Sequence, residues 1–517
     1  MTRLLPASFA ALTVALSGCW KPDPGVATLA QAEGPVSLVT LPGSAPATDL
    51  VLMARAGAAH DPPGHEGLAY LTARMLREGG AGDRTPEQVD ALLYRLGTDV
   101  SVVVDQEIVT LRARALHEDL PELADLMADM VLEPAFDADA FARVRDEALD
   151  DLSTGIFASD EALGQQVLQD WLYAGNPYGH PVQGRLGSLE ALDTDDLRGF
   201  LDERWVRPAV VLGVSGPAAL TGDALDPAAA GGAAVQRLRD RLAGLPARVY
   251  RDVSPRGVAS FEGRHVLVVE KDTAGTGIHF GHPIAVTRAH PDWPALLLAT
   301  MALGEHRQSH GRLYRALRTT RGLNYGDYAY LENYRQDGWS ARQQVGTGRV
   351  QNHFSTWIRP VTADNGPFAL KAALDLVSDW SARGLEEDEL ERMKGYLPAR
   401  IALWGDEPIR RLGWAVEARL MGWPDPLDDL PARIAALSGD DVRAALDRHI
   451  TPDDLRVVVV TADGQAFLDA LGAPSPLVYA GEAPALGSPQ AAQDRAWAEA
   501  TVEVAGADLV ATEGLFQ

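Results

Sequence analysis

Cysteine is nearly absent from this chain of 517 residues, which contains one, Cys19. A single thiol cannot form an intramolecular disulfide, and it cannot supply the several thiolates of a cysteine-based zinc site. Basic residues are also scarce, 46 against 72 acidic ones, which gives a formal net charge of -26. Nucleic acids and anionic lipid surfaces are bound through clustered Lys and Arg, so this balance counts against both as partners.

Several motifs and long apolar runs are missing as well. Beyond the first nineteen residues, no apolar run reaches the about 18 residues of a membrane-spanning helix. The chain contains neither a Gly-Lys-Ser/Thr phosphate loop nor a Gly-x-Ser-x-Gly elbow, which counts against nucleotide binding and serine hydrolysis. What is present is a globular composition, 46% hydrophobic. A chain of this length predicts about two to four folded domains.

The first nineteen residues have the pattern of a targeting segment. Arg3 precedes an apolar run from Leu4 to Leu16, and Leu16-Ser17-Gly18-Cys19 follows. This ending resembles a bacterial lipobox, which implies cleavage before Cys19 and attachment of lipid to its sulfur. Trp20, rather than Asp, follows the cysteine, and this favours the outer membrane, facing the periplasm. We therefore expect a signal peptide over 1–18, a tether over 19–46 and a lipoprotein of the cell envelope.

Two stretches of the chain recur in the same order. Thr194 to Arg198, which precedes an apolar strand, is matched by Gly439 to Arg443, and Phe136 to Arg143 is matched by Leu385 to Arg392. Such self-similarity predicts a duplicated unit. We expect two α+β halves over 47–216 and 251–465, a linker over 217–250, and an Ala-, Pro- and Glu-rich tail over 466–517 for which no structure is predicted.

Periodicity and capping patterns predict individual elements within the first half. Thr85 and Gln88 form a capping-box pattern in front of a helix. The predicted helices are 64–80, 86–96, 120–132, 137–151, 162–173 and 194–204, and the predicted strands are 50–56, 100–104, 107–114 and 209–214.

The stretch from Gly64 to Gly80, GHEGLAYLTARMLREGG, predicts an amphipathic helix with glycines near both ends. Its frame resembles the zinc helix of the insulinase and mitochondrial-processing-peptidase family, M16, whose inverted motif is His-x-x-Glu-His. On that motif Tyr70 replaces the first histidine, Ala73 the general-base glutamate and Arg74 the second histidine. Two histidines at i and i+4 can share a zinc ion that a nearby carboxylate assists. The residues present here cannot, so we expect no metal in this chain.

The resemblance places Glu147 at the third zinc ligand, on a later helix. If Arg74 and Glu147 converge as the family ligands do, the guanidinium neutralises the carboxylate that would otherwise bind zinc. The loop Asn176-Pro177-Tyr178-Gly179-His180-Pro181 resembles a family loop, where His180 is expected to be structural. Duplicated domains of this kind imply a fold in which two mainly antiparallel sheets packed against helices form half of a clam-shell.

The second half carries a further match. Gly311 to Arg318, followed by Arg321-Gly322-Leu323-Asn324-Tyr325, resembles the family stretch whose arginine and tyrosine bind substrate near zinc. The resemblance assigns that role to Arg321 and Tyr325, a fixed cation and a phenol donor suited to a peptide carbonyl. From the residues alone, a glycine turn with a solvated Arg321 and a core Tyr325 is the simpler interpretation.

Two other groupings could form rival metal sites. His306 and His310 have i, i+4 spacing beside Glu305, but glycines bracket them and no glutamate stands at a general-base position. His60, His65 and Glu66 lie in a Pro- and Gly-rich turn, where exposed polar residues are expected in any case. We favour neither.

Three functions are compatible with these features. The first is a lipid-anchored, non-catalytic subunit that supplies Arg321 and Tyr325 in trans to a zinc-bearing M16 partner and to its peptide substrate. The second is a scaffold or peptide-binding lipoprotein without proteolytic activity. The third is an autonomous peptidase with a rebuilt metal site, which stoichiometric zinc in the purified chain would indicate.

Overall fold

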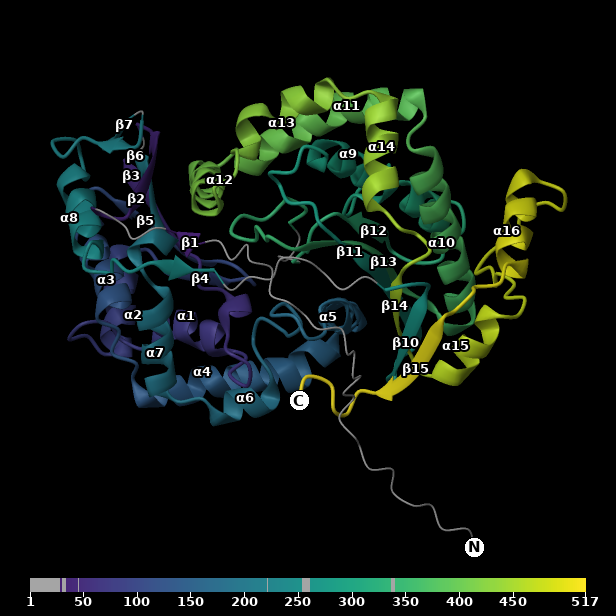
Figure 1. The fold of residues 1–517 in the computed structure, drawn as a ribbon, viewed down its shortest axis with the longest axis horizontal. Coiled ribbons are helices and arrows are strands. Elements are labelled where there is room, and N and C mark those ends of the chain that lie inside the picture. The colour runs from purple at the N-terminus through teal and green to yellow at the C-terminus, as the bar shows by residue number, and fades with distance from the viewer. Residues whose placement is uncertain (1–27, 30–33, 45, 221, 253–260, 336–339) are drawn as a thin grey trace, which may run out of the picture.

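The computed structural model describes residues 28–29, 34–44, 46–220, 222–252, 261–335 and 340–517. The predicted signal peptide, together with Cys19 and half of the predicted tether, lies outside these residues. None of the helices in the described ranges is both long and apolar enough to cross a membrane. The rest of the chain forms two α+β domains, each with one main sheet (Figure 1).

The first domain is built on a five-stranded sheet in the order β2-β6-β3-β5-β4. β2 and β6 are parallel, and the other neighbours are antiparallel. Within the described part of the chain β4 pairs with β5 alone and is therefore an edge strand. The strands are β2 (Ser37–Pro42), β3 (Ala47–Ala54), β4 (Val100–Val104), β5 (Val109–Leu116) and β6 (Val210–Gly216).

The second domain repeats this arrangement. Its six-stranded sheet has the order β12-β13-β11-β14-β10-β15. Read from β10 to β12, its strands follow the same order as the first sheet read from β2 to β4, namely first, last, second, fourth and third strand. β10 and β14 are parallel, as β2 and β6 are. The strands are β10 (His265–Glu270), β11 (Gly275–Ile284), β12 (Asp327–Tyr330), β13 (Asn352–Thr362), β14 (Arg456–Thr461) and β15 (Gly506–Ala511). The predicted fold class and duplication are confirmed.

Helices surround both sheets, and local sequence sets many of their ends. Thr85 and Asp193 form capping boxes in front of α2 and α7, which begin and end at the predicted residues. The first domain holds α1 (Leu68–Glu78), α2 (Pro86–Leu96), α3 (Leu120–Leu132), α4 (Ala138–Asp150), α5 (Asp160–Leu172), α6 (Leu186–Ala191) and α7 (Thr194–Arg204). The second holds α9 (Trp293–Gly304), α10 (Gly366–Arg383), α11 (Glu387–Ala402), α12 (Pro408–Met421), α13 (Pro426–Ala435) and α14 (Gly439–His449).

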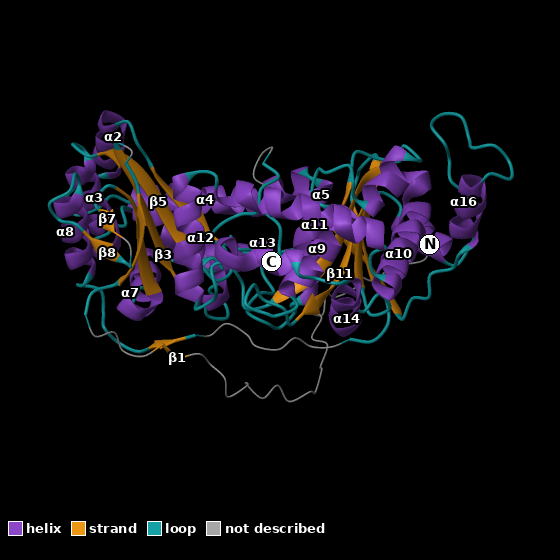
Figure 2. Cartoon of the chain, turned by 90° about the horizontal axis from the view of Figure 1, so that it is seen from above, coloured by secondary structure: helices purple, strands orange, loops and turns teal. Residues whose placement is uncertain are grey.

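The two domains exchange helices. α12, from the second half, packs on β6, β3 and β2 of the first sheet, whereas α5, from the first half, packs on β11 and β14 of the second sheet (Figures 1 and 2). Glycine permits both close approaches. A Cβ on Gly213 of β6 would lie 2.3 Å from Val416 of α12, and a Cβ on Gly164 of α5 would lie 2.3 Å from Nδ1 of His279 in β11.

Burial follows this exchange strand by strand. In β3, Leu50 and Leu52 belong to the core under α1 and α3, whereas Val51 and Met53 belong to the core that includes α12. Successive side chains of a strand point to opposite faces, so each sheet is covered on both. This explains why β3 and β14 read as almost continuous apolar runs rather than as alternating ones.

The linker and the tail contain more structure than the sequence predicts. The linker holds α8 (Gly232–Leu242), which packs on α3. There are also two short antiparallel strand pairs: β7 (Ala219–Leu220) pairs with β8 (Ala224–Leu225), and β9 (Tyr250–Arg251) pairs with β1 (Thr28–Leu29). The tail forms α15 (Gly464–Leu471), α16 (Pro489–Glu499) and β15, which pairs in parallel with β10. Beyond β15, Phe516 is buried in the first-domain core, and its carbonyl accepts the N–H of Leu186 at 2.9 Å.

Candidate functional site

The helix α1 presents two of the substituted motif positions at the surface of the first domain. Its start is fixed by the carboxylate of Asp61, which accepts the backbone N–H groups of Gly67 and Ala69 at 2.7 Å each. The apolar side of the helix is buried, and Tyr70 and Arg74 lie one turn apart on its half-buried side. The side chain of Arg74 therefore faces α4, which carries Glu147.

Arg74 is the centre of a polar cluster that joins these two helices. Its guanidinium donates to Tyr70 Oη at 2.9 Å, to Glu78 Oε1 at 2.5 Å and to Glu147 Oε2 at 2.8 Å. Arg143 of α4 bridges Glu78 and Glu147 at 2.8 and 2.9 Å. The hydrogen bond from Arg74 lowers the pKa of Glu147, so the carboxylate is held in its charged form. The predicted convergence of Arg74 and Glu147 is present.

These residues do not fit a zinc ion. Zinc in proteins is bound by imidazole, thiolate or carboxylate groups, and only Glu147 of the three equivalent positions belongs to that set. That carboxylate is already paired with two guanidinium groups. A dication would have to replace a permanent positive charge that is held by three hydrogen bonds.

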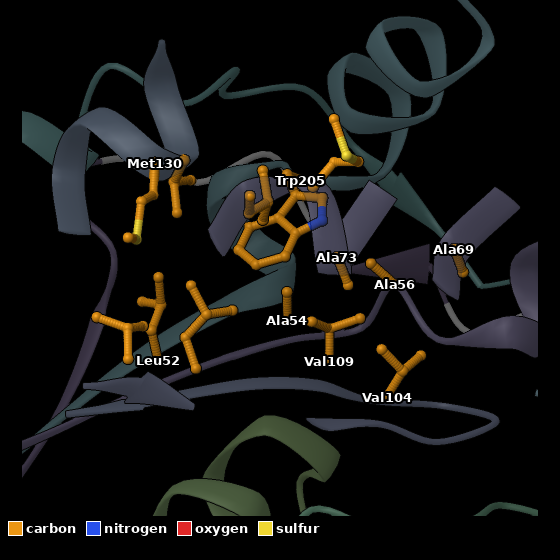
Figure 3. Packing of buried hydrophobic residues seen from close by; sticks show 14 of the residues in the cluster. Leu52, Ala54, Ala56, Ala69, Ala73, Val104, Val109, Met130 and Trp205 are labelled. Atoms are coloured by element: carbon orange, nitrogen blue, oxygen red, sulfur yellow. The ribbon is translucent and has the colours of Figure 1, made fainter. Parts of the chain in front are cut away.

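The position of the general base has become part of the hydrophobic core. Ala73 is fully buried in the first-domain core with Trp205 and Val109 (Figure 3). A methyl group there contributes to packing and has no acid–base chemistry. The helix has thus lost the catalytic carboxylate as well as two ligands, and the fold around it is well packed.

A groove follows the edge strand β4 past this cluster. Two hollows lie along it, one of about 860 Å³ and the other of about 560 Å³, and Arg74 and Val102 line both. The second is an amide-rich space between the domains, with Gln165 and Gln169 of α5 and with Arg335 from the second half. We call the two hollows together the β4 groove.

Arg321 is not in an open site. It is 6% exposed, and its guanidinium donates to Asp494 at 2.6 Å, to Gln493 at 2.9 Å and to the carbonyl of Ala316 at 2.7 Å. The guanidinium also lies 4.2 Å from the ring centroid of Trp497. Three of these partners belong to α16 in the tail, a contact that the local motif could not predict.

Tyr325 lies in a different environment. Its side chain is 76% exposed, so it is not the core residue of the simpler interpretation. The guanidinium beside it belongs to Arg318, which lies 5.3 Å from the Tyr325 ring and 4.8 Å from the Tyr314 ring and donates to the Tyr325 carbonyl at 2.5 Å. No described hydrogen bond or ring contact joins Tyr325 to Arg321. The sequence signal that could have pointed to Arg318 is its i, i+4 spacing from Tyr314, which predicts that these two side chains meet.

The histidines considered as rival ligands are separated by their surroundings. His306 is buried against three tyrosines and contacts Tyr330 Oη at 2.6 Å, whereas His310 lies against Tyr396 with Nε2 3.5 Å from Glu305. In the turn before α1, His60 is buried while His65 is exposed. His180 is a buried loop residue whose Nδ1 lies 2.8 Å from the Pro181 carbonyl.

Two other clusters bring three possible metal ligands together within the described part of the chain. In the first, His60 lies near Glu107 and Asp252, but Arg55 pairs with both carboxylates. The ring of His60 is also occupied, since Nε2 lies 2.6 Å from the hydroxyl of Tyr250. Both carboxylates of this buried network are therefore paired with a guanidinium and not with an ion.

The second cluster joins the start of α9 to the end of α14. His449 Nε2 lies 2.8 Å from Asp292, and His290 lies 4.0 Å from the same carboxylate. Arg448 donates to both oxygens of Asp292 at 2.9 Å, and this contact lowers the pKa of that carboxyl. A guanidinium therefore already holds the anionic ligand that a metal would need.

Comparison with known proteins identifies the family of these domains. The sequence model of insulinase, peptidase family M16, matches residues 41–184, and that of the peptidase M16 inactive domain matches residues 233–395. Together the two matches span more than half of the chain.

Individual proteins that resemble the chain support the same family assignment. An uncharacterised zinc protease of Streptomyces coelicolor is 25% identical over 421 residues, 78% of this chain and 83% of that protein. The mitochondrial-processing peptidase subunit beta of Dictyostelium discoideum is 20% identical over 251 residues, 48% of this chain and 50% of that protein. A crystal structure of a peptidase M16 inactive domain from Pseudomonas fluorescens has a TM-score of 0.69 at 22% identity and covers 85% of this chain and 98% of that chain. With its duplicated domains and substituted zinc helix, the chain belongs to the insulinase-like peptidase family, M16.

Proposed function

We propose that the protein is a lipid-anchored, non-catalytic subunit of a bacterial M16 peptidase, which binds peptide and completes the site of a zinc-bearing partner. The observation that carries this proposal is the position of Arg74. Its guanidinium contacts Tyr70, Glu78 and Glu147. A cation of the protein itself therefore satisfies the carboxylates next to the former metal site, and the fold keeps its shape without zinc.

Peptide binding is supported by the β4 groove. Among the described strands β4 pairs with β5 alone, so its other edge offers a place for an extended peptide, beside the Val104 carbonyl that already accepts from Arg335 at 3.2 Å. Ser101 and Val102 line the groove, with Arg74 beside them. An added strand would gain main-chain hydrogen bonds along β4 and would lie next to the Arg74 cluster.

The second part of the proposal concerns the residues offered to the partner. The family resemblance points to Arg321 and Tyr325, but α16 holds Arg321. Arg318 and Tyr325 form the pair that supports the role better, because a half-buried guanidinium lies against an exposed phenol. We propose that this pair binds the peptide carbonyl next to the zinc of the partner subunit.

Attachment to the outer membrane through lipidated Cys19 is part of the same proposal and is supported by the lipobox pattern. The N-terminal tether would allow the two domains to lie in the periplasm while the lipid holds the chain at the membrane. The mitochondrial-processing relative is named as a subunit, which supports a paired assembly.

A second candidate function is that of a scaffold or peptide-binding lipoprotein without any proteolytic role. The observation that favours it is the capture of Arg321 by Asp494 and Trp497 of α16. A residue that the resemblance assigns to substrate is here used for internal packing. The two candidates differ in whether cleavage activity accompanies the complex.

Purification of the lipidated chain with its bound partner, followed by metal analysis and a peptide-cleavage assay, tests the proposal. We expect zinc in the complex but not in the isolated chain. Removing the hydroxyl in Tyr325→Phe should lower cleavage by the complex at least about tenfold, as loss of an oxyanion donor does. Tyr94→Phe, at a 90% exposed tyrosine of α2, is the matched control and should leave the rate unchanged.

Each candidate has its own contradicting result. Cleavage that is insensitive to Tyr325→Phe would remove the role in trans. Absence of cleavage by every complex recovered would favour the scaffold. Stoichiometric zinc in the isolated chain would indicate an autonomous peptidase with a rebuilt metal site.

A further inference from the structure

The second hollow of the β4 groove, of about 560 Å³, is rich in side-chain amides. The amides that line it are Gln165, Gln166, Gln169, Gln183 and Asn333. We call this space the amide hollow. Val102 and Val104 of β4 line it too, so a peptide that pairs with β4 passes along it. Its size is typical of small-ligand sites, in which a few polar groups fix the orientation of the ligand.

Two glutamines of α5 are held in one orientation by partners that can only accept a hydrogen bond. Gln165 Nε2 donates to the main-chain carbonyl of Tyr334 at 2.6 Å, and Gln166 Nε2 donates to Asp170 at 2.7 Å. Burial raises the pKa of Asp170 to about 6, so this group is a carboxylate at neutral pH. A carbonyl or a carboxylate has no proton to donate, and each amide must therefore turn its NH₂ group toward its partner.

Gln183, in the loop before α6, is held in the same way. Its Nε2 donates to the carboxylate of Asp151 at 2.6 Å. Within the described residues the Oε1 atoms of these three glutamines make no hydrogen bond, and they are not sealed from solvent. The three side chains are half-buried and line the amide hollow. The hollow therefore offers a ligand several accessible carbonyl oxygens whose orientation is already fixed.

The charged groups of the amide hollow decide between a neutral and a charged donor. Arg349 pairs with Asp105 at 2.7 Å, and Arg74 pairs with Glu147 at 2.8 Å. Arg335 also lines the hollow, and no carboxylate within the described ranges pairs with it. An incoming lysine or arginine would lose hydration beside this guanidinium. The lining therefore favours a neutral donor over a cation.

A primary carboxamide is the group that matches this lining. Its NH₂ group can donate to the glutamine oxygens, while its carbonyl can accept from Arg335, which has further N–H groups beyond the one that it donates to Val104. A carboxylate of the same shape has no N–H and places negative charge against the oxygens. An apolar side chain displaces water from them without replacing its hydrogen bonds. Sites of this kind reject ligands that lack the matching donor.

We propose that the amide hollow binds the carboxamide side chain of an asparagine or glutamine from the peptide in the β4 groove. Successive side chains of an added strand point to opposite faces of the sheet, so a residue that pairs near Val102 or Val104 can direct its side chain into the hollow. This inference rests on the proposed peptide-binding function and adds a preference for one class of residue.

Four blocked peptides that differ at one residue test this preference. The probe is Ac-Thr-Val-Thr-Xaa-Thr-Val-Thr-NH₂, whose β-branched residues suit an added strand, with Gln, Met, Glu or Lys at the central position. Isothermal titration calorimetry with the full-length protein measures each Kd. We expect the Gln peptide to bind at least about fivefold more tightly than each of the others, as expected for one net hydrogen bond.

Variants of the protein locate the effect. Gln166→Met and Gln183→Met keep the length of the side chain and remove the amide. In the double variant the preference for the Gln peptide over the Met peptide should fall below about twofold. Should the double variant not fold in urea-unfolding measurements, each single variant carries the same test with a smaller loss. A preference that persists in the variants would place the carboxamide elsewhere and overturn the proposal.

The chain offers a matched control for these variants. Gln236 of α8 donates to Asp240 at 2.8 Å with the same i, i+4 spacing as Gln166 and Asp170, but it does not line the amide hollow. Gln236→Met should leave all four affinities unchanged. If it reduces the preference as much as Gln166→Met does, the effect does not come from the hollow.

These titrations need neither a partner nor zinc, so they can succeed when the peptide-cleavage assay fails. Equal binding of the four peptides would leave the groove as a peptide site and overturn the preference alone. Tighter binding of the Lys or the Glu peptide would overturn it as well. Binding of none of the four would overturn both this inference and the peptide-binding role of the β4 groove.

Discussion

Replacement of Arg74 tests whether its side chain holds α1 and α4 together. Methionine keeps the apolar stem and removes the guanidinium, so Arg74→Met deletes the hydrogen bonds to Tyr70, Glu78 and Glu147 without opening a large cavity. Hydrogen bonds to charged groups contribute about 1.5–3 kcal/mol each when buried. The side chain of Glu147 is 47% exposed, so solvent screening reduces its share to well under 1 kcal/mol.

We therefore expect Arg74→Met to lower the free energy of unfolding by about 2 kcal/mol. The corresponding loss in Tm is about 4–8 °C for a domain of this size. Glu147→Gln alone should cost about 0.5 kcal/mol, and the double variant should cost less than the sum by a similar amount. Urea unfolding followed by circular dichroism, at pH 7 and moderate salt, measures all four forms of the cycle.

The control for this cycle is Arg77, which lies on the same helix with a similarly exposed side chain. Arg77 pairs with Asp90 and Asp99 rather than with Glu147. The effects of Arg77→Met and Glu147→Gln should add. If Arg74→Met and Glu147→Gln also add, or if Arg74→Met leaves the unfolding curve unchanged, the pairing does not stabilise the fold and the argument from Arg74 is wrong.

Three further predictions concern metal, pH and the tail. Changing both Tyr70 and Arg74 to histidine should create a zinc site with Glu147, which mass spectrometry would detect as stoichiometric bound zinc, but it should not create peptidase activity. If the double variant still binds zinc after Glu147→Ala, this geometry is contradicted. Burial lowers the pKa of His279 to about 3, below its ordinary 6.5, so its contribution to stability is complete above about pH 6.5 and is lost as the pH falls, by about 2 kcal/mol at pH 5. In His279→Phe, the decline in Tm between pH 7 and 5 should be smaller, and an equal decline would exclude this histidine as a cause. Phe516→Ala should destabilise the chain by about 3 kcal/mol in urea unfolding, and a change below about 0.5 kcal/mol would mean that the end of the chain does not support the first domain.

Much of the fold could be predicted from the sequence where local chemistry determines it. The capping boxes at Thr85 and Asp193 fix the starts of α2 and α7 through hydrogen bonds within four residues. The recurrence of Thr194 to Arg198 and Gly439 to Arg443 indicates the duplication that the two strand orders confirm. The strand β15 could not be predicted in the same way, because it depends on pairing with β10, far away in the sequence.

The candidate site shows the same limit. Arg74 and Glu147 are 73 residues apart, but the family resemblance gave their relative position, and charge complementarity then predicted the contact. Arg321 was assigned from a motif that ends a few residues later. Its partner Asp494 lies 173 residues further along the chain, and the motif contains no information about that contact. Tyr325 is exposed whereas Arg321 is buried. This difference depends on how the whole chain packs and cannot be read from the spacing of the two residues in the sequence.

The exchange of α5 and α12 has a consequence for how the chain is made. One face of the first sheet, with Val51 and Met53, is covered by α12, whose last residue follows the last strand of that sheet by roughly 200 residues. At about 5–20 residues per second, a ribosome needs on the order of 10–40 seconds to supply that stretch. During this interval the first half exposes an apolar sheet face. For the exported lipoprotein proposed above, which must stay unfolded until it has crossed the membrane, a late covering helix would delay premature folding and at the same time create a need for chaperone protection.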